Sequence, residues 1–207
     1  MVTGRRVVLL HGMWMVGATM QWFAARLRSH GYATETFGYH SVVGGPDAVI
    51  PQLIAQLRDG GDTDIVAHSL GGLMSLQALA REPGLPVRRV VCLGTPLCGS
   101  SAAGRLAASP ITKLWLGRSA GLLQDGCTAW PGRFEVGMIA GRLPHGLGAL
   151  VARFDGDNDG TVAVEETRSP QLKDHVVLPA SHSGLIFSSE AARQAARFLD
   201  RGSFEHA

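Results

Sequence analysis

The chain has few of the features that mark nucleic-acid-binding or membrane-spanning proteins. Only two of its 207 residues are lysines, Lys113 and Lys173, and the net charge is +2. The basic residues are mainly scattered arginines, so we expect no nucleic-acid partner. No run approaches the roughly 20 apolar residues that a membrane helix needs, which excludes a transmembrane segment. The apolar run Val7–Leu10 is also too short for a secretory signal.

Cysteine is scarce as well. The chain has three cysteines, an odd number, and their spacing does not match a metal site: Cys92, Cys98 and Cys127. Cys92 lies in an apolar run and is interpreted as a small buried hydrophobe. Free thiols are the default for a chain without an export signal. We therefore expect a reduced, cytoplasmic protein that needs no metal and no cofactor.

Short apolar runs alternate with segments of helical periodicity along the whole chain. This alternation predicts one α/β domain over 1–207, with a mostly parallel central sheet of about six strands and helices on both faces. The expected strands are 6–10, 32–37, 64–67, 87–93, 134–140, 150–154 and 175–178, and the expected helices are 19–30, 46–58, 70–81 and 189–199.

Ser69 lies in the segment Ala67-His68-Ser69-Leu70-Gly71-Gly72, between an apolar strand-like run and a helical run. A serine at such a sharp strand-to-helix turn exposes its hydroxyl above the sheet. The residues around it must be small, because the turn is strained and neighbouring strands pass close by. Ala67 replaces the first glycine of the usual Gly-x-Ser-x-Gly pattern. We interpret Ser69 as a candidate nucleophile.

A serine nucleophile requires a base, and the base requires an orienting acid. His182 follows the last expected strand, so it reaches the same sheet edge as Ser69. The alternative is an ordinary polar loop residue. His68 is next to the serine, but the turn should point its side chain away. The acid should precede the base, and the segment 155–162 supplies three aspartates: Asp155, Asp157 and Asp159.

The same segment also matches a calcium-binding loop. Asp155, Asp157, Asp159, Gly160 and Glu166 have the spacing of the oxygen ligands and of the turn glycine. A calcium-binding loop of this kind lies between two helices, but prolines and glycines interrupt the helical pattern on both sides of this segment. The context therefore disfavours a helix-loop-helix calcium site, although a looser metal site stays an alternative.

An oxyanion needs fixed hydrogen-bond donors. His11-Gly12-Met13 follows the first strand, and the N–H groups of Met13 and Leu70 form a candidate pair of donors. The alternative for His11-Gly12 is a simple tight turn. Trp14 and Met15, beside the donor, are either substrate contacts in an apolar acyl pocket or buried spacers.

Taken together, these motifs resemble the α/β-hydrolase superfamily, in particular bacterial lipases and esterases with an Ala-x-Ser-x-Gly elbow. The matching segments are Leu10-His11-Gly12, Ala67–Gly72, Gly94-Thr95-Pro96 with Gly99-Ser100, Asn158–Val162 and His182. The resemblance assigns the acid to Asp159. It also places Leu97 where the family often has a histidine, and Leu97 is therefore a further candidate substrate contact.

The resemblance implies a serine hydrolase of the carboxylic ester class (EC 3.1.1) that acts on a small ester with an apolar acyl group. The chain is short for the family, so any cap is small. We expect it between residues 96 and 130, where Leu114, Trp115, Leu116, Leu122 and Leu123 either form an apolar lid or pack on the core. A thioesterase or acyltransferase with the same residues, a non-catalytic binding protein of this fold, and a calcium-regulated module are the alternatives. The sequence does not specify the oligomeric state.

Overall fold

The structure is a computed structural model that describes residues 4–108, 114–145 and 156–206. Six strands form one parallel sheet in the order β2-β1-β3-β4-β5-β6. The strands are β1 (Arg6–Leu10), β2 (Ala33–Phe37), β3 (Thr63–His68), β4 (Val87–Leu93), β5 (Glu135–Gly141) and β6 (Asp174–Leu178). The predicted fold class is confirmed, and the six clearest strands lie where the sequence pattern puts them. The additional strand expected at 150–154 lies outside the described residues.

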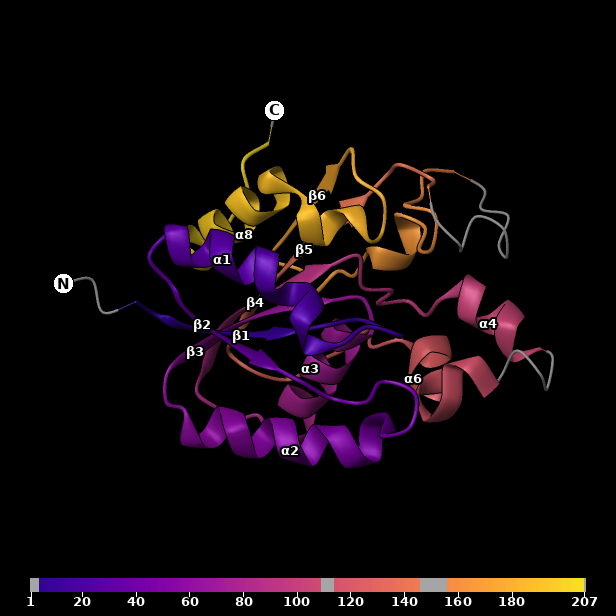
Figure 1. Cartoon of the computed structure of the whole chain (residues 1–207), viewed down its shortest axis with the longest axis horizontal. Helices are drawn as coiled ribbons and strands as arrows, with labels where there is room; N and C mark the ends of the chain where they lie inside the picture. The colour runs from indigo at the N-terminus through magenta and orange to yellow at the C-terminus, as the bar shows by residue number, and fades with distance from the viewer. Residues whose placement is uncertain (1–3, 109–113, 146–155, 207) are drawn as a thin grey trace.

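Helices cover both faces of the sheet (Figure 1). On one face lie α1 (Gln21–Ser29) and α8 (Ser189–Arg201), and on the other lie α2 (Gly45–Asp59) and α3 (Leu70–Arg81). Parallel strands need such crossovers, and their apolar side chains are then buried on both sides. β3 shows the result, because all six of its residues are buried.

Each face of the sheet has its own apolar core. The first core packs strand residues against α2, α3 and the segment that contains α4 (Ser101–Ala107) and α6 (Ala120–Asp125). The second core packs the opposite strand faces against α1 and α8. α8 begins at a Ser188 cap, whose hydroxyl accepts the N–H of Ala191.

Among the described residues, four short 3-10 helices lie in the connections: η1 (Gly17–Met20), η2 (Gly117–Ser119), η3 (Glu165–Thr167) and η4 (Gly184–Phe187). The expected helix at 19–30 is therefore divided into η1 and α1. Among the described residues, no helix is long and apolar enough to cross a membrane.

Candidate active site

Ser69 occupies the turn between β3 and α3. Its backbone has φ +52° and ψ −120°, a conformation that non-glycine residues rarely adopt. Three hydrogen bonds hold it there. The Ser69 N–H donates to the Leu93 carbonyl (2.9 Å), and the Ser69 carbonyl accepts the Thr95 hydroxyl (3.0 Å) and the Gly72 N–H (3.0 Å). A strained residue that is held in this way is typical of a functional position.

The glycines after Ser69 are required by close approach of neighbouring chain. A Cβ at Gly71 would lie 2.6 Å from the His11 carbonyl oxygen. A Cβ at Gly72 would lie 2.1 Å from the hydroxyl oxygen of Thr95. Ala67 is fully buried, and its methyl group is accommodated where the usual Gly-x-Ser-x-Gly pattern has its first glycine. The prediction that small residues surround the elbow agrees with these distances.

Asp159 and His182 form a buried hydrogen-bonded pair. His182 Nδ1 lies 2.7 Å from Asp159 Oδ2, and the His182 N–H donates to the Asp159 carbonyl (2.9 Å). The second carboxylate oxygen accepts the N–H groups of Thr161 (2.9 Å) and Val162 (2.7 Å). Asp159 is only 1% exposed. These bonds fix both the carboxylate and one edge of the imidazole.

Gly94 brings this pair next to β4 and thereby to Ser69. It follows β4 directly and has φ +56°. A Cβ there would lie 3.1 Å from both Asp159 Oδ2 and His182 Nδ1. Ser69 is hydrogen-bonded to Leu93, the residue before Gly94, so the three predicted residues lie at the same carboxyl edge of the sheet.

His68 takes part in the site in a way that sequence reasoning missed. Its Nε2 lies 3.0 Å from the His182 carbonyl oxygen, and the two ring centroids are 4.7 Å apart. The ring is fully buried, and burial lowers the pKa of His68 to about 3, with the nearby His182 as a second cause. A neutral His68 therefore donates from Nε2 and holds the main chain of His182. The sequence predicts that this side chain points away from the serine, and it indicates no contact with His182.

The turn that follows β1 lies over the elbow. A Cβ at Gly12 would lie 3.1 Å from the Cβ of Ser69. The hydroxyl of Tyr39 donates to the His11 carbonyl (2.6 Å), and the two rings stack with centroids 4.2 Å apart. Burial lowers the pKa of His11 and raises that of Tyr39, which keeps the first neutral and the second protonated. Within the described chain, the N–H groups of Met13 and Leu70 donate to no protein acceptor.

The candidate substrate contacts differ in exposure. Trp14 is 57% exposed, Met15 is half-buried beside α1, and Leu97 is fully buried. In the expected cap, Leu116, Leu122 and Leu123 pack on the core, whereas Leu114 and Trp115 are exposed. Their roles in substrate binding, and a cap at 96–130 as a unit, stay predictions.

Two carboxylates of the calcium-like loop, those of Glu166 and Asp159, accept hydrogen bonds from the protein itself. The Glu166 carboxylate accepts the N–H groups of Ser101 (2.8 Å) and Ala163 (3.0 Å). Asp159 uses both of its oxygens as described above, and Asp155 lies outside the described residues. In the part of the chain that the structure describes, no three His, Cys, Asp or Glu residues form a cluster that could hold a metal ion.

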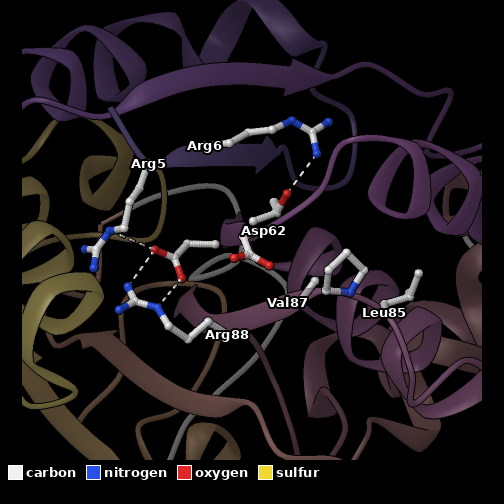
Figure 2. Close-up of a pocket in the computed structure, with 9 residues that line it drawn as sticks. Arg5, Arg6, Asp62, Leu85, Val87 and Arg88 are labelled. Atoms are coloured by element: carbon white, nitrogen blue, oxygen red, sulfur yellow. Dashed lines mark hydrogen bonds and ion pairs between the residues drawn. The ribbon is translucent and has the colours of Figure 1, made fainter. Parts of the chain in front are cut away.

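A charged pocket lies at the opposite, amino edge of the sheet (Figure 2). Asp64 is buried there and pairs with Arg88 (2.9 Å) and Arg5 (3.7 Å). Arg6 pairs with Glu35 (2.7 Å). Because these charges compensate one another and lie far from Ser69 along the strands, we assign this pocket a structural role.

No protein-family model matches the chain, and no functionally curated protein is significantly similar to it in sequence. Solved structures do resemble it. Bacillus licheniformis lipase BlEst2 in mature form superimposes with a TM-score of 0.78 at 22% identity, over 95% of this chain and 91% of that one. Phospholipase PlaB from Legionella pneumophila, in complex with thio-NAD, superimposes with a TM-score of 0.73 at 16% identity, over 96% of this chain and 59% of that one. A pyrethroid hydrolase from Sphingobium faniae JZ-2 superimposes with a TM-score of 0.65 at 16% identity, over 96% of this chain and 98% of that one. The chain therefore has the α/β-hydrolase fold.

Proposed function

We propose that the protein is a serine hydrolase that cleaves carboxylic esters with an apolar acyl group. The observation that carries the proposal is the buried 2.7 Å bond between His182 and Asp159, at the same sheet edge as a serine in a strained elbow. An isolated serine hydroxyl is a weak nucleophile, and this arrangement supplies the base and the acid that it needs. Structural neighbours named as a lipase, a phospholipase and a hydrolase support the reaction class.

In the proposed mechanism, Ser69 Oγ attacks the ester carbonyl carbon while His182 Nε2 takes the hydroxyl proton. Asp159 holds the Nδ1–H of the imidazole and stabilises its cation. The carbonyl oxygen becomes an oxyanion, which the N–H groups of Met13 and Leu70 stabilise. The carbon–oxygen bond to the alcohol then breaks, and the alcohol leaves with the proton from His182.

A water molecule completes the reaction. His182 takes a proton from the water as it attacks the acyl-Ser69 carbonyl, and it returns this proton to Ser69 Oγ when the carboxylic acid leaves. His68 supports both steps because its pKa near 3 keeps it neutral next to the imidazolium, so it adds no like charge. The exposed Trp14, Leu114 and Trp115 are consistent with an apolar substrate.

The test is hydrolysis of a chain-length series of p-nitrophenyl esters and matched thioesters by the wild type and by Ser69→Ala. We expect the serine variant to lose at least about 10⁴-fold in kcat/KM. Ser183→Ala is the matched control, because Ser183 is exposed and adjacent to His182. An unchanged rate in Ser69→Ala would refute the proposal. Faster turnover of thioesters than of esters would instead identify a thioesterase.

A further inference from the structure

Trp14 has a backbone conformation that its side chain disfavours. Among the described residues, only two non-glycine positions have a positive φ: Ser69 at +52° and Trp14 at +58°. Bulky residues are rarely found there, so contacts must hold the conformation in place. The sharp turn between β3 and α3 accounts for the positive φ of Ser69. It does not account for the positive φ of Trp14, which lies in another loop.

Two hydrogen bonds restrain Trp14, one from its main chain and one from its side chain. The main-chain N–H donates to Ser41 Oγ (3.1 Å), and the indole Nε1–H donates to the carbonyl of Trp115 (2.8 Å). Ser41 is buried, and its own carbonyl accepts the hydroxyl of Ser119 (2.7 Å). The loop before α2 and the segment around η2 therefore anchor Trp14 together.

Burial does not account for the position of Trp14, since its side chain is 57% exposed. The two hydrogen bonds of Trp14 instead restrain Met13, the residue before Trp14. On the other side of Met13, Gly12 packs against the elbow, because a Cβ there would lie 2.8 Å from His68 Nδ1 and 3.1 Å from Ser69 Cβ. The Met13 peptide is thus fixed from both sides.

We propose that Trp14 is a positioning residue for the oxyanion site. It uses its two hydrogen bonds to hold a disfavoured turn, and this turn orients the Met13 N–H toward the developing oxyanion. The inference rests on the proposed function, because it assigns a role within the same site. A Trp14 that acted only as an apolar substrate contact would affect substrate binding and not the chemical step.

Three variants separate these roles. Trp14→Phe keeps an apolar ring but loses the indole donor, so the strained turn relaxes. Ser41→Ala removes the second anchor and leaves the Trp14 ring in place. Val43→Ala is the matched control, because it shortens an exposed apolar side chain in the same loop as Ser41 and removes neither anchoring hydrogen bond.

The measurement is kcat and KM for a p-nitrophenyl ester, together with the melting temperature. Removing one oxyanion donor commonly costs about 10²–10³-fold in kcat, and a displaced donor should lose part of this, about 10-fold. We expect this loss in Trp14→Phe and Ser41→Ala, with KM within about twofold and Val43→Ala like the wild type.

An unchanged kcat in both anchor variants would overturn the inference. A raised KM with normal kcat would do the same and would identify a substrate contact. An equal loss in Val43→Ala would show that any change in this loop impairs turnover, and it would overturn a specific role of the two hydrogen bonds. If wild-type turnover does not depend on Ser69, the proposed function fails first, and this role fails with it.

Discussion

The surroundings of Asp159 allow a sharp prediction for Asp159→Asn. One carboxylate oxygen accepts two main-chain N–H groups, those of Thr161 and Val162, and the other faces His182 Nδ1 at 2.7 Å. The new amide must keep its oxygen toward the two N–H groups, since the reverse orientation leaves both without an acceptor. Its NH₂ group then faces His182 Nδ1.

This orientation forces the wrong tautomer on His182. Nδ1 must accept from the amide, so the ring proton moves to Nε2, and Nε2 then has no lone pair for the proton of Ser69. The equivalent exchange in a serine protease lowers kcat about 10⁴-fold, which corresponds to about 5.5 kcal/mol. We expect a loss of about 10³–10⁴-fold in kcat/KM. The melting temperature should change little, because the two loop hydrogen bonds remain.

The assay is p-nitrophenyl ester hydrolysis combined with thermal unfolding. Asp157→Asn is the matched control, because Asp157 is an exposed aspartate of the same loop. We expect this control to have wild-type activity. Retention of more than a tenth of the activity in Asp159→Asn, or an equal loss in Asp157→Asn, would refute the assignment of the acid.

Three further predictions concern the surroundings of the site. Gly94→Ala places a Cβ 3.1 Å from the Asp159–His182 bond at φ +56°, so both activity and stability should fall, the latter by about 1–2 kcal/mol in urea unfolding. His68 binds a proton in the unfolded state below pH 6.5 but in the folded state only near pH 3, so stability should decline as the pH falls through this window. His68→Gln should make that decline shallower by up to about 1.4 kcal/mol per pH unit. Glu166→Ala leaves two N–H groups without their acceptor and should cost about 2 kcal/mol, whereas calcium or EDTA should not shift the melting temperature of the wild type.

The parts of the fold that depend on local pattern were predictable. The strand β3 and the helix α3 follow from an apolar run and a helical period, and the turn between them follows from the small residues around Ser69. Ligand sites of parallel sheets lie at the carboxyl ends of the strands, so the sequence also predicted that His182 lies at the same sheet edge as Ser69. The choice of Asp159 over its neighbours came from the resemblance, and the hydrogen bond to His182 agrees with it.

The remaining features depend on contacts between segments that are distant in sequence. His68 reaches the main chain of His182 across 114 positions, and the indole of Trp14 reaches Trp115 across 101. No periodicity or spacing encodes these pairs. The sequence shows a histidine directly before Ser69, but the role of His68 depends on the position of the loop that carries His182, and the sequence does not give this position. The positive φ of Trp14 has no sequence signal, because such positions usually favour glycine.

The central claim is that Ser69 is the nucleophile. The most direct measurement is covalent labelling with a fluorophosphonate, followed by peptide mass spectrometry to locate the adduct. We expect one adduct, on the peptide that contains Ser69, with much slower labelling in Asp159→Asn and none in Ser69→Ala. An adduct on another residue, or labelling that persists in Ser69→Ala, would contradict it.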